Sequence, residues 1–131
     1  MATNGPVKRI LVVDDDHAIR EMIVRYLRQT YGAQGWEIDA VGDGEQAVTS
    51  VRFKRPAIVL LDYAMPGMSG LDTLRLIHKV DARIPVIVIT ASDSTRVASE
   101  VIQAGAFSYL PKPIRFPYLD HLLATALGSK A

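Results

Sequence analysis

The chain has 131 residues, the size of a single domain, and its 49% of apolar residues is enough for a sizeable core. Its 15 basic and 14 acidic residues give a net charge of +1, which predicts neither direct nucleic-acid binding within this chain nor membrane binding. Without cysteine, disulfides, thiolate catalysis and cysteine-based zinc sites are excluded, and the first ten residues lack the apolar segment of a signal peptide. We expect a cytoplasmic protein with one domain, residues 1–131, whose core spans about 8–127 between short tails.

Five short segments have the composition of β-strands. Three are unbroken apolar runs, at residues 10–13, 58–61 and 86–89. Such short runs, rich in β-branched residues, are typical of parallel strands that are covered on both faces. Residues 36–41 are predicted to form an edge strand, and residues 108–110 a short strand before Pro111.

Helical patterns alternate with these strands. The first has apolar residues at helical spacing, with charged residues such as Arg20 on its other face: Ile19, Met22, Ile23, Tyr26 and Leu27. Shorter patterns cover residues 47–51, 71–77 and 97–102, and the last helix is predicted from Pro117 to Gly128. Trp36 and Tyr118 are interpreted as packing residues. Five strand-helix units in succession predict an α/β domain with five helices and a parallel sheet.

Polar residues fall where the predicted strands end. Asp14 and Asp15 follow the first strand, Asp62 ends the third, Thr90 ends the fourth, and Lys112 follows the fifth. In an open α/β sheet, ligands bind at this edge, where the strand order reverses. In the order 2-1-3-4-5, the first and third strands flank that point. The three aspartates are therefore expected to converge.

Converging carboxylates repel one another, by about 4 kcal/mol for two unit charges about 4 Å apart at an effective dielectric of about 20. Such a cluster needs shared protons or a cation, and oxygen ligands in a chain without cysteine favour Mg²⁺. Mg²⁺ and Lys112 would neutralise the oxygens of a transferring phosphoryl group, and Thr90 would donate a hydrogen bond to it. Asp62 would then attack the phosphorus.

Each of these residues also has a structural interpretation when it is taken alone. Asp16 is expected to cap the first helix, and Asp14 and Asp15 could be turn residues. Thr90 could simply end a strand, and Lys112 could be a solvated loop lysine. The functional hypothesis rests on all of them falling at one edge of the sheet.

Four segments resemble, in order and spacing, the receiver domain of bacterial two-component response regulators, of the single-domain CheY-like kind: "ILVVDDD", "LLDYAMPGMSGLDTL", "PVIVITAS" and "AGAFSYLPKPI". The resemblance covers about residues 8 to 127, nearly the whole chain. It implies a flavodoxin-like, doubly wound sheet of five parallel strands in the order 2-1-3-4-5, with five helices.

The resemblance also implies roles for individual residues. Asp62 would be the phosphoacceptor, and Thr90 and Lys112 would hold the phosphoryl oxygens. Mg²⁺ would be bound by Asp14, Asp15, Asp62 and the backbone carbonyl of Ala64. Tyr109 would be an aromatic switch that moves inward as the Thr90 hydroxyl moves toward phosphate.

The loops around this site contain glycine, proline and small residues that are expected to shape it. Gly67 and Gly70 are expected to provide unusual backbone dihedrals in a tight loop, and the Lys112–Pro113 peptide is expected to be cis. Ala64 and Ser92 are small residues that leave the site open.

Several functions compete. The first is a phosphorylation switch that is not an enzyme and takes phosphate from a histidine kinase or a histidine phosphotransfer protein. It would bind a downstream target protein through the face formed by the fourth helix, fifth strand and fifth helix. The alternatives are a phosphatase-like hydrolase with an aspartate nucleophile, a receiver excised from a longer DNA-binding transcription regulator, and a receiver-like module with an unused pocket. The hydrolase would need a second acid where the chain has Ala64.

Overall fold

The computed structural model describes residues 8–91 and 95–128. The elements follow in chain order as β1 (Arg9–Val13), α1 (His17–Tyr31), the 3₁₀ turn η1 (Gly32–Gln34), β2 (Glu37–Val41), α2 (Gly44–Phe53), β3 (Ile58–Asp62), α3 (Gly70–Val80), β4 (Val86–Thr90), α4 (Thr95–Gln103), β5 (Ser108–Pro111) and α5 (Phe116–Gly128). This alternation confirms the predicted α/β class. Most of the predicted tails, and Ser92, lie outside the described residues.

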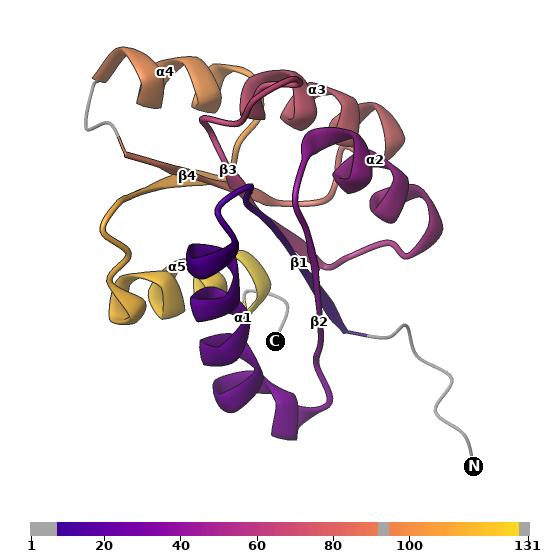
Figure 1. Ribbon diagram of the computed structural model, residues 1–131, viewed down its shortest axis with the longest axis vertical. Coiled ribbons are helices and arrows are strands. Elements are labelled where there is room, and N and C mark those ends of the chain that lie inside the picture. Colours follow the sequence, from indigo (N-terminus) through magenta and orange to yellow (C-terminus); the bar gives the residue numbers. More distant parts are fainter. Residues whose placement is uncertain (1–7, 92–94, 129–131) are drawn as a thin grey trace.

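All the strands pair in parallel, in the order β2-β1-β3-β4-β5. The flavodoxin-like, doubly wound topology is therefore confirmed (Figure 1). β3 lies at the centre, and each of its residues is buried. Val13 at the end of β1 pairs with Leu61 in β3. This register brings Asp14, the next residue after β1, beside Asp62 at the edge formed by the carboxyl ends of the strands, which we call the carboxyl edge.

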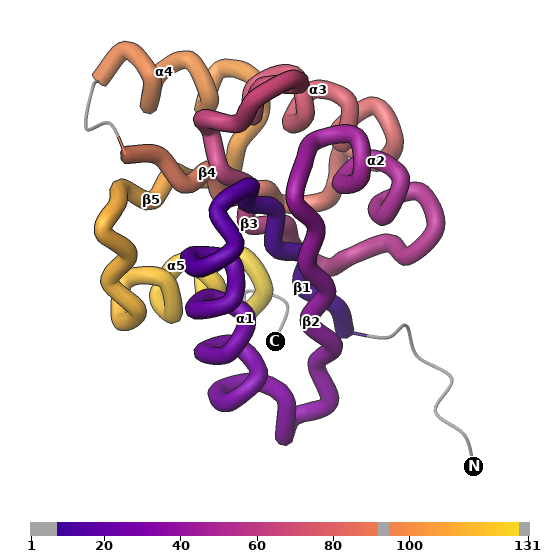
Figure 2. The backbone as a smooth tube through the Cα atoms, viewed as in Figure 1, coloured from indigo at the N-terminus to yellow at the C-terminus, as the bar shows by residue number. Residues whose placement is uncertain are grey.

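Helices cover both faces of the sheet. Alternate residues of β1 point to opposite faces, so Leu11 and Val13 join one core cluster, whereas Ile10 and Val12 join the other. The first cluster includes buried residues of α2, α3 and α4, and the second includes buried residues of α1 and α5. Figure 2 shows the two layers on either side of the strands. No helix in the described part of the chain is long and apolar enough to cross a bilayer.

The first helix begins as predicted. The carboxylate of Asp16 accepts hydrogen bonds from the backbone N–H groups of Ala18 and Ile19, which confirms its role as N-cap. The predicted apolar face is wrong at Met22, whose side chain is 44% exposed. On a helical wheel, the centre of the buried stripe lies between Ile23 and Leu27. Val24 is closer to this centre than Met22 is, and Val24 is buried instead of Met22.

The last helix is fastened to the first. The hydroxyl groups of Tyr26 and Tyr31 both donate hydrogen bonds to the carboxylate of Asp120 on α5, the second at 2.8 Å. The Tyr26 ring also stacks on Phe116, with 4.0 Å between the ring centroids. These contacts add polar anchors to the apolar packing between α1 and α5.

The prediction of a packing role is confirmed for Trp36 and wrong for Tyr118. Trp36 packs against the core cluster between the sheet and the α1/α5 layer, as predicted. Tyr118 is 43% exposed, so its predicted packing role is wrong. The reason is its place on α5, which directs Leu119, Leu122 and Leu123 to the core.

Candidate functional site

Two aspartates after β1 and one at the end of β3 meet at the carboxyl edge. One carboxylate oxygen from each of Asp14, Asp15 and Asp62 lies within 4.8 Å of the others. Asp14 and Asp62 are 1% and 2% exposed, whereas Asp15 is exposed. The strand order thus produces the expected convergence, with two of the three carboxylates buried.

The carboxylate of Asp14 is only partly satisfied. Its Oδ1 accepts a hydrogen bond from the backbone N–H of Asp16 at 2.9 Å. Its buried Oδ2 has no hydrogen-bond partner in the described structure. A buried carboxylate oxygen without a donor is costly, and clustered carboxylate oxygens are ligands that Mg²⁺ prefers. These residues therefore fit a divalent metal ion.

Lys112 places a cation beside the same cluster. Its Nζ lies 3.3 Å from Oδ1 of Asp62. Its backbone N–H donates to the carbonyl of Thr90 at 2.8 Å, which holds the start of the β5–α5 loop beside the end of β4. Thr90 is 3% exposed, and the Lys112–Pro113 peptide is cis, as expected. The structure therefore brings Thr90 and Lys112 to the edge where the aspartates lie.

Burial dominates the electrostatics of the two enclosed carboxyls. It raises the pKa of Asp62 to about 6; the charge of Asp14 adds to the rise, and Lys112 opposes it. Burial also raises the pKa of Asp14, against the hydrogen bond from the Asp16 backbone and the charge of Lys112, which lower it. Both groups are harder to ionise than ordinary aspartates, so a bound cation would favour their ionised forms.

Replacing Asp62 with asparagine is expected to stabilise the metal-free protein above about pH 6. A carboxyl whose pKa is raised by folding binds more protons in the folded than in the unfolded state between the two pKa values, so stability falls as the pH rises through that range. The rise from 3.8 to about 6 corresponds to about 3 kcal/mol at neutral pH. Urea unfolding in EDTA across this range should show the decline in the wild type and a flatter profile in the variant. Equal dependence of the free energy of unfolding on pH in the two proteins would show that burial does not raise the pKa of Asp62.

Two glycines shape the loop after Asp62 in different ways. Gly67 has a φ of +75°, which confirms the predicted need for an unusual dihedral. The same prediction is wrong for Gly70, whose φ is not positive. A Cβ on Gly70 would lie 2.5 Å from the backbone oxygen of Asp62 and 2.7 Å from Cα of Tyr63. Glycine is therefore needed because α3 begins in close contact with the backbone of Asp62 and Tyr63.

Two side-chain contacts of this region are not predicted from the sequence. Tyr63, which follows Asp62, donates its hydroxyl to Glu100 on α4 at 2.8 Å. Arg20, predicted on the solvated face of α1, donates to the backbone carbonyl of Asp14 at 2.7 Å. The first contact joins distant segments and leaves no local signal. The second could have been found from the position of Arg20 in the first turns of the helix, close to the loop it contacts.

Ala64 and Tyr109 complete the set of predicted site residues. Ala64 is exposed in the loop two residues after Asp62, so its small side chain lies at the surface beside the cluster. Tyr109 is half-buried on β5 and packs against the core cluster on the side of α2, α3 and α4. The roles assigned to these two residues stay predictions.

Known proteins share this fold and sequence pattern. The response regulator receiver domain family matches residues 10–124. The DNA-binding response regulator MtrA of Mycolicibacterium paratuberculosis is 40% identical over 108 residues, which are 82% of this chain and 46% of MtrA. The chain thus spans about half the length of the curated relatives it matches.

Solved structures agree with this match. The chemotaxis protein CheY4 of Vibrio cholerae superposes with a TM-score of 0.80 at 25% identity, over 92% of this chain and 99% of that one. The signal receiver domain of a putative LuxO repressor from Vibrio parahaemolyticus gives a TM-score of 0.80 at 30% identity, over 93% and 91% of the two chains. The chain therefore belongs to the receiver domains of response regulators, which act in two-component signal transduction.

Proposed function

We propose that this chain is a Mg²⁺-dependent phosphorylation switch whose phosphoacceptor is Asp62. Receiver domains of this family take phosphate from histidine kinases and bind Mg²⁺ at an acidic pocket. The observation that carries the proposal is the buried carboxylate of Asp62, with Lys112 at 3.3 Å and with Asp14 and Asp15 after the end of the neighbouring strand β1. The donor would be a histidine kinase or a histidine phosphotransfer protein, and the setting the cytoplasm.

The proposed reaction follows from the groups at the carboxyl edge. A carboxylate oxygen of Asp62 attacks the phosphorus of the donor, an acyl phosphate bond forms, and the bond to the donor nitrogen breaks. The Lys112 ammonium and the Thr90 hydroxyl can stabilise the phosphoryl oxygens. Asp14, Asp15, Asp62 and the backbone carbonyl of Ala64 would hold Mg²⁺, which would supply positive charge to offset the negative charge of the site.

The output would be a change in protein binding at the face formed by α4, β5 and α5. Three of the exposed large apolar residues belong to these elements or adjoin them: Ile102 on α4, Phe107 before β5 and Tyr118 on α5, at 45%, 41% and 43% exposure. Exposed apolar side chains of this size favour a protein partner. Tyr109 on β5 lies between α4 and α5 in the chain. Its side chain would move inward together with the Thr90 hydroxyl when the chain is phosphorylated. Phosphorylation would favour one of two states of this face.

The test is the intact mass of the chain after incubation with a small phosphodonor, with Mg²⁺ or with EDTA. The proposal predicts one added phosphoryl group that forms only with Mg²⁺. Rapid release of phosphate without an adduct would favour a hydrolase or a very short-lived adduct, although the apolar side chain of Ala64 cannot serve as a second acid. Neither adduct nor phosphate would indicate a module whose pocket is unused.

Replacing Lys112 with glutamine is expected to slow adduct formation by about 100-fold, because one charged donor to the phosphoryl oxygens is lost. The substitution also removes the charge that lowers the pKa of Asp62, so the carboxylate becomes harder to ionise. The rate of mass increase in Mg²⁺ measures the effect. Lys79→Gln, at an exposed position on α3, is the matched control and should react at the wild-type rate. An unchanged rate for the Lys112 variant would remove this lysine from the mechanism.

A further inference from the structure

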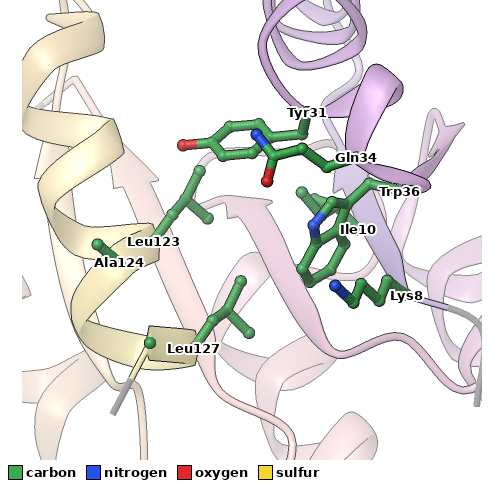
Figure 3. A pocket seen from close by; sticks show the side chains of 9 residues that line it. Lys8, Ile10, Tyr31, Gln34, Trp36, Leu123, Ala124 and Leu127 are labelled. Carbon is green, nitrogen blue, oxygen red and sulfur yellow. The ribbon is translucent and has the colours of Figure 1, made fainter. Parts of the chain in front are cut away.

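A pocket lies at the opposite end of the sheet from Asp62, at the edge formed by the amino ends of the strands. It has a volume of about 510 Å³ and lies between α5 and the start of β1 and β2 (Figure 3). Ile10, the second residue of β1, lines it, and so does Trp36, which directly precedes β2. A volume of this size suits a small organic molecule. The pocket shares no lining residue with the carboxyl-edge site.

The walls of this pocket are aromatic and aliphatic. Tyr31 and Trp36 line one side, and Leu123 and Leu127 of α5 line the other (Figure 3). The hydroxyl of Tyr31 is already used, because it donates to Asp120 at 2.8 Å. Tyr31 therefore offers the pocket its ring but no free O–H donor. A flat apolar body between the rings and the leucines would be buried on both sides.

A single lysine provides positive charge at this pocket. The Nζ of Lys8 lies 5.7 Å from the centroid of the Trp36 ring, at the lower end of the pocket in Figure 3. Its backbone carbonyl accepts the N–H of Glu37 at 2.8 Å, which fixes the start of the side chain. The carboxylate of Glu37 is paired with Arg9 at 2.6 Å, and no ion pair within 4.0 Å involves Lys8 among the residues that the structure describes. The ammonium group is thus available to an anion.

Gln34 adds a hydrogen-bond acceptor. Its Nε2 donates to the backbone carbonyl of Thr30 at 3.3 Å, which orients the amide. The amide oxygen then faces the pocket, as Figure 3 shows. A ligand that fits this arrangement carries an N–H or O–H donor as well as a negative charge.

We propose that this pocket binds a small aromatic carboxylate that bears an O–H or N–H donor. Its ring would lie between Trp36 and the leucines of α5, its carboxylate would pair with Lys8, and its donor would reach Gln34. The apolar walls would supply affinity, whereas the two polar groups would supply orientation and selectivity. A cationic ligand of the same shape would be repelled by the lysine.

The test uses the single tryptophan of the chain, whose indole N–H gives one resonance. A solution of the ¹⁵N-labelled chain is titrated with 4-hydroxybenzoate, and then with its neutral isostere 4-hydroxybenzamide. The proposal predicts a saturable shift of the Trp36 resonance with the acid and binding at least about 5-fold weaker with the amide, as expected for the loss of one ionic contact worth about 1 kcal/mol. Lys8→Gln should weaken binding of the acid to the same extent, whereas Lys54→Gln, an exposed lysine on another surface, should not.

Three results would overturn the proposal. The first is an indole resonance that does not shift up to the solubility limit of the acid. The second is equal affinity for the acid and the amide, or for the wild type and Lys8→Gln, because either result would remove the ionic contact. The third is a shift on concentrating the protein alone, which would assign the pocket to a second copy of the chain.

Discussion

Replacing Asp62 with asparagine is expected to abolish the phosphoryl adduct that the wild type forms with a small phosphodonor in Mg²⁺. An amide oxygen is a poor nucleophile, and an acyl phosphate cannot form on it without loss of the amide. Asp14 cannot readily replace Asp62, because one of its oxygens is held by the Asp16 backbone and the Lys112 ammonium lies beside Asp62 at 3.3 Å. Intact mass after incubation with the donor measures the loss, which should be complete.

Asp43→Asn is the matched control for this loss. Asp43 also follows a strand at the carboxyl edge, but its carboxylate caps α2 by accepting the backbone N–H of Gln46 at 2.8 Å. Asparagine caps a helix about as well as aspartate, so this variant should keep both its fold and the adduct. An adduct that survives in the Asp62 variant would place the acceptor elsewhere. Loss of the adduct in both variants would indicate a general effect of removing negative charge.

Gly70→Ala is expected to destabilise the fold by about 3 kcal/mol or more, which is typical of a forced backbone displacement in a packed region. The three atoms nearest to the added Cβ are all backbone atoms: the carbonyl oxygens of Asp62 and Tyr63 at 2.5 and 2.8 Å, and Cα of Tyr63 at 2.7 Å. No side-chain rotation can relieve these contacts, so α3 must move away from the end of β3. Urea unfolding gives the change in the free energy of unfolding.

Gly32→Ala is the control for that substitution. A Cβ on Gly32 would meet nothing within 4 Å, and the residue has helical dihedrals, with φ at −59° and ψ at −39°. Its replacement should change stability by less than about 1 kcal/mol and can be stabilising, because alanine restricts the unfolded chain. If the two variants unfold at the same urea concentration, the close contact at Gly70 does not constrain the fold.

The sequence predicts the framework of this protein well, for physical reasons that can be traced to particular residues. The runs 58–61 and 86–89 are apolar at every position because both faces of the central strands are covered, and such an unbroken run is hard to mistake for a surface element. Polar residues next to such runs must lie at their ends. The sequence pattern alone therefore places Asp62 and Thr90 at one edge of the sheet.

Other features depend on contacts that the sequence does not encode locally. The hydrogen bond of Tyr63 to Glu100 joins residues 37 positions apart, and the pocket beside Trp36 is formed by three segments that meet only in the fold. The need for glycine at residue 70 is predictable, but its cause is the nearby backbone and not its own dihedrals. The prediction is wrong at Met22 because this residue lies at the margin of the apolar stripe of α1, where its side chain is exposed.

The most direct test of the proposed switch is to locate the phosphoryl group. The phosphorylated chain is reduced with borohydride, which converts an aspartyl phosphate into homoserine, and the digested peptides are sequenced by mass spectrometry. We expect homoserine at residue 62 and unchanged residues at positions 14 and 15. Homoserine at either of those positions, or phosphate retained on a histidine, would contradict the assignment of Asp62 as the phosphoacceptor.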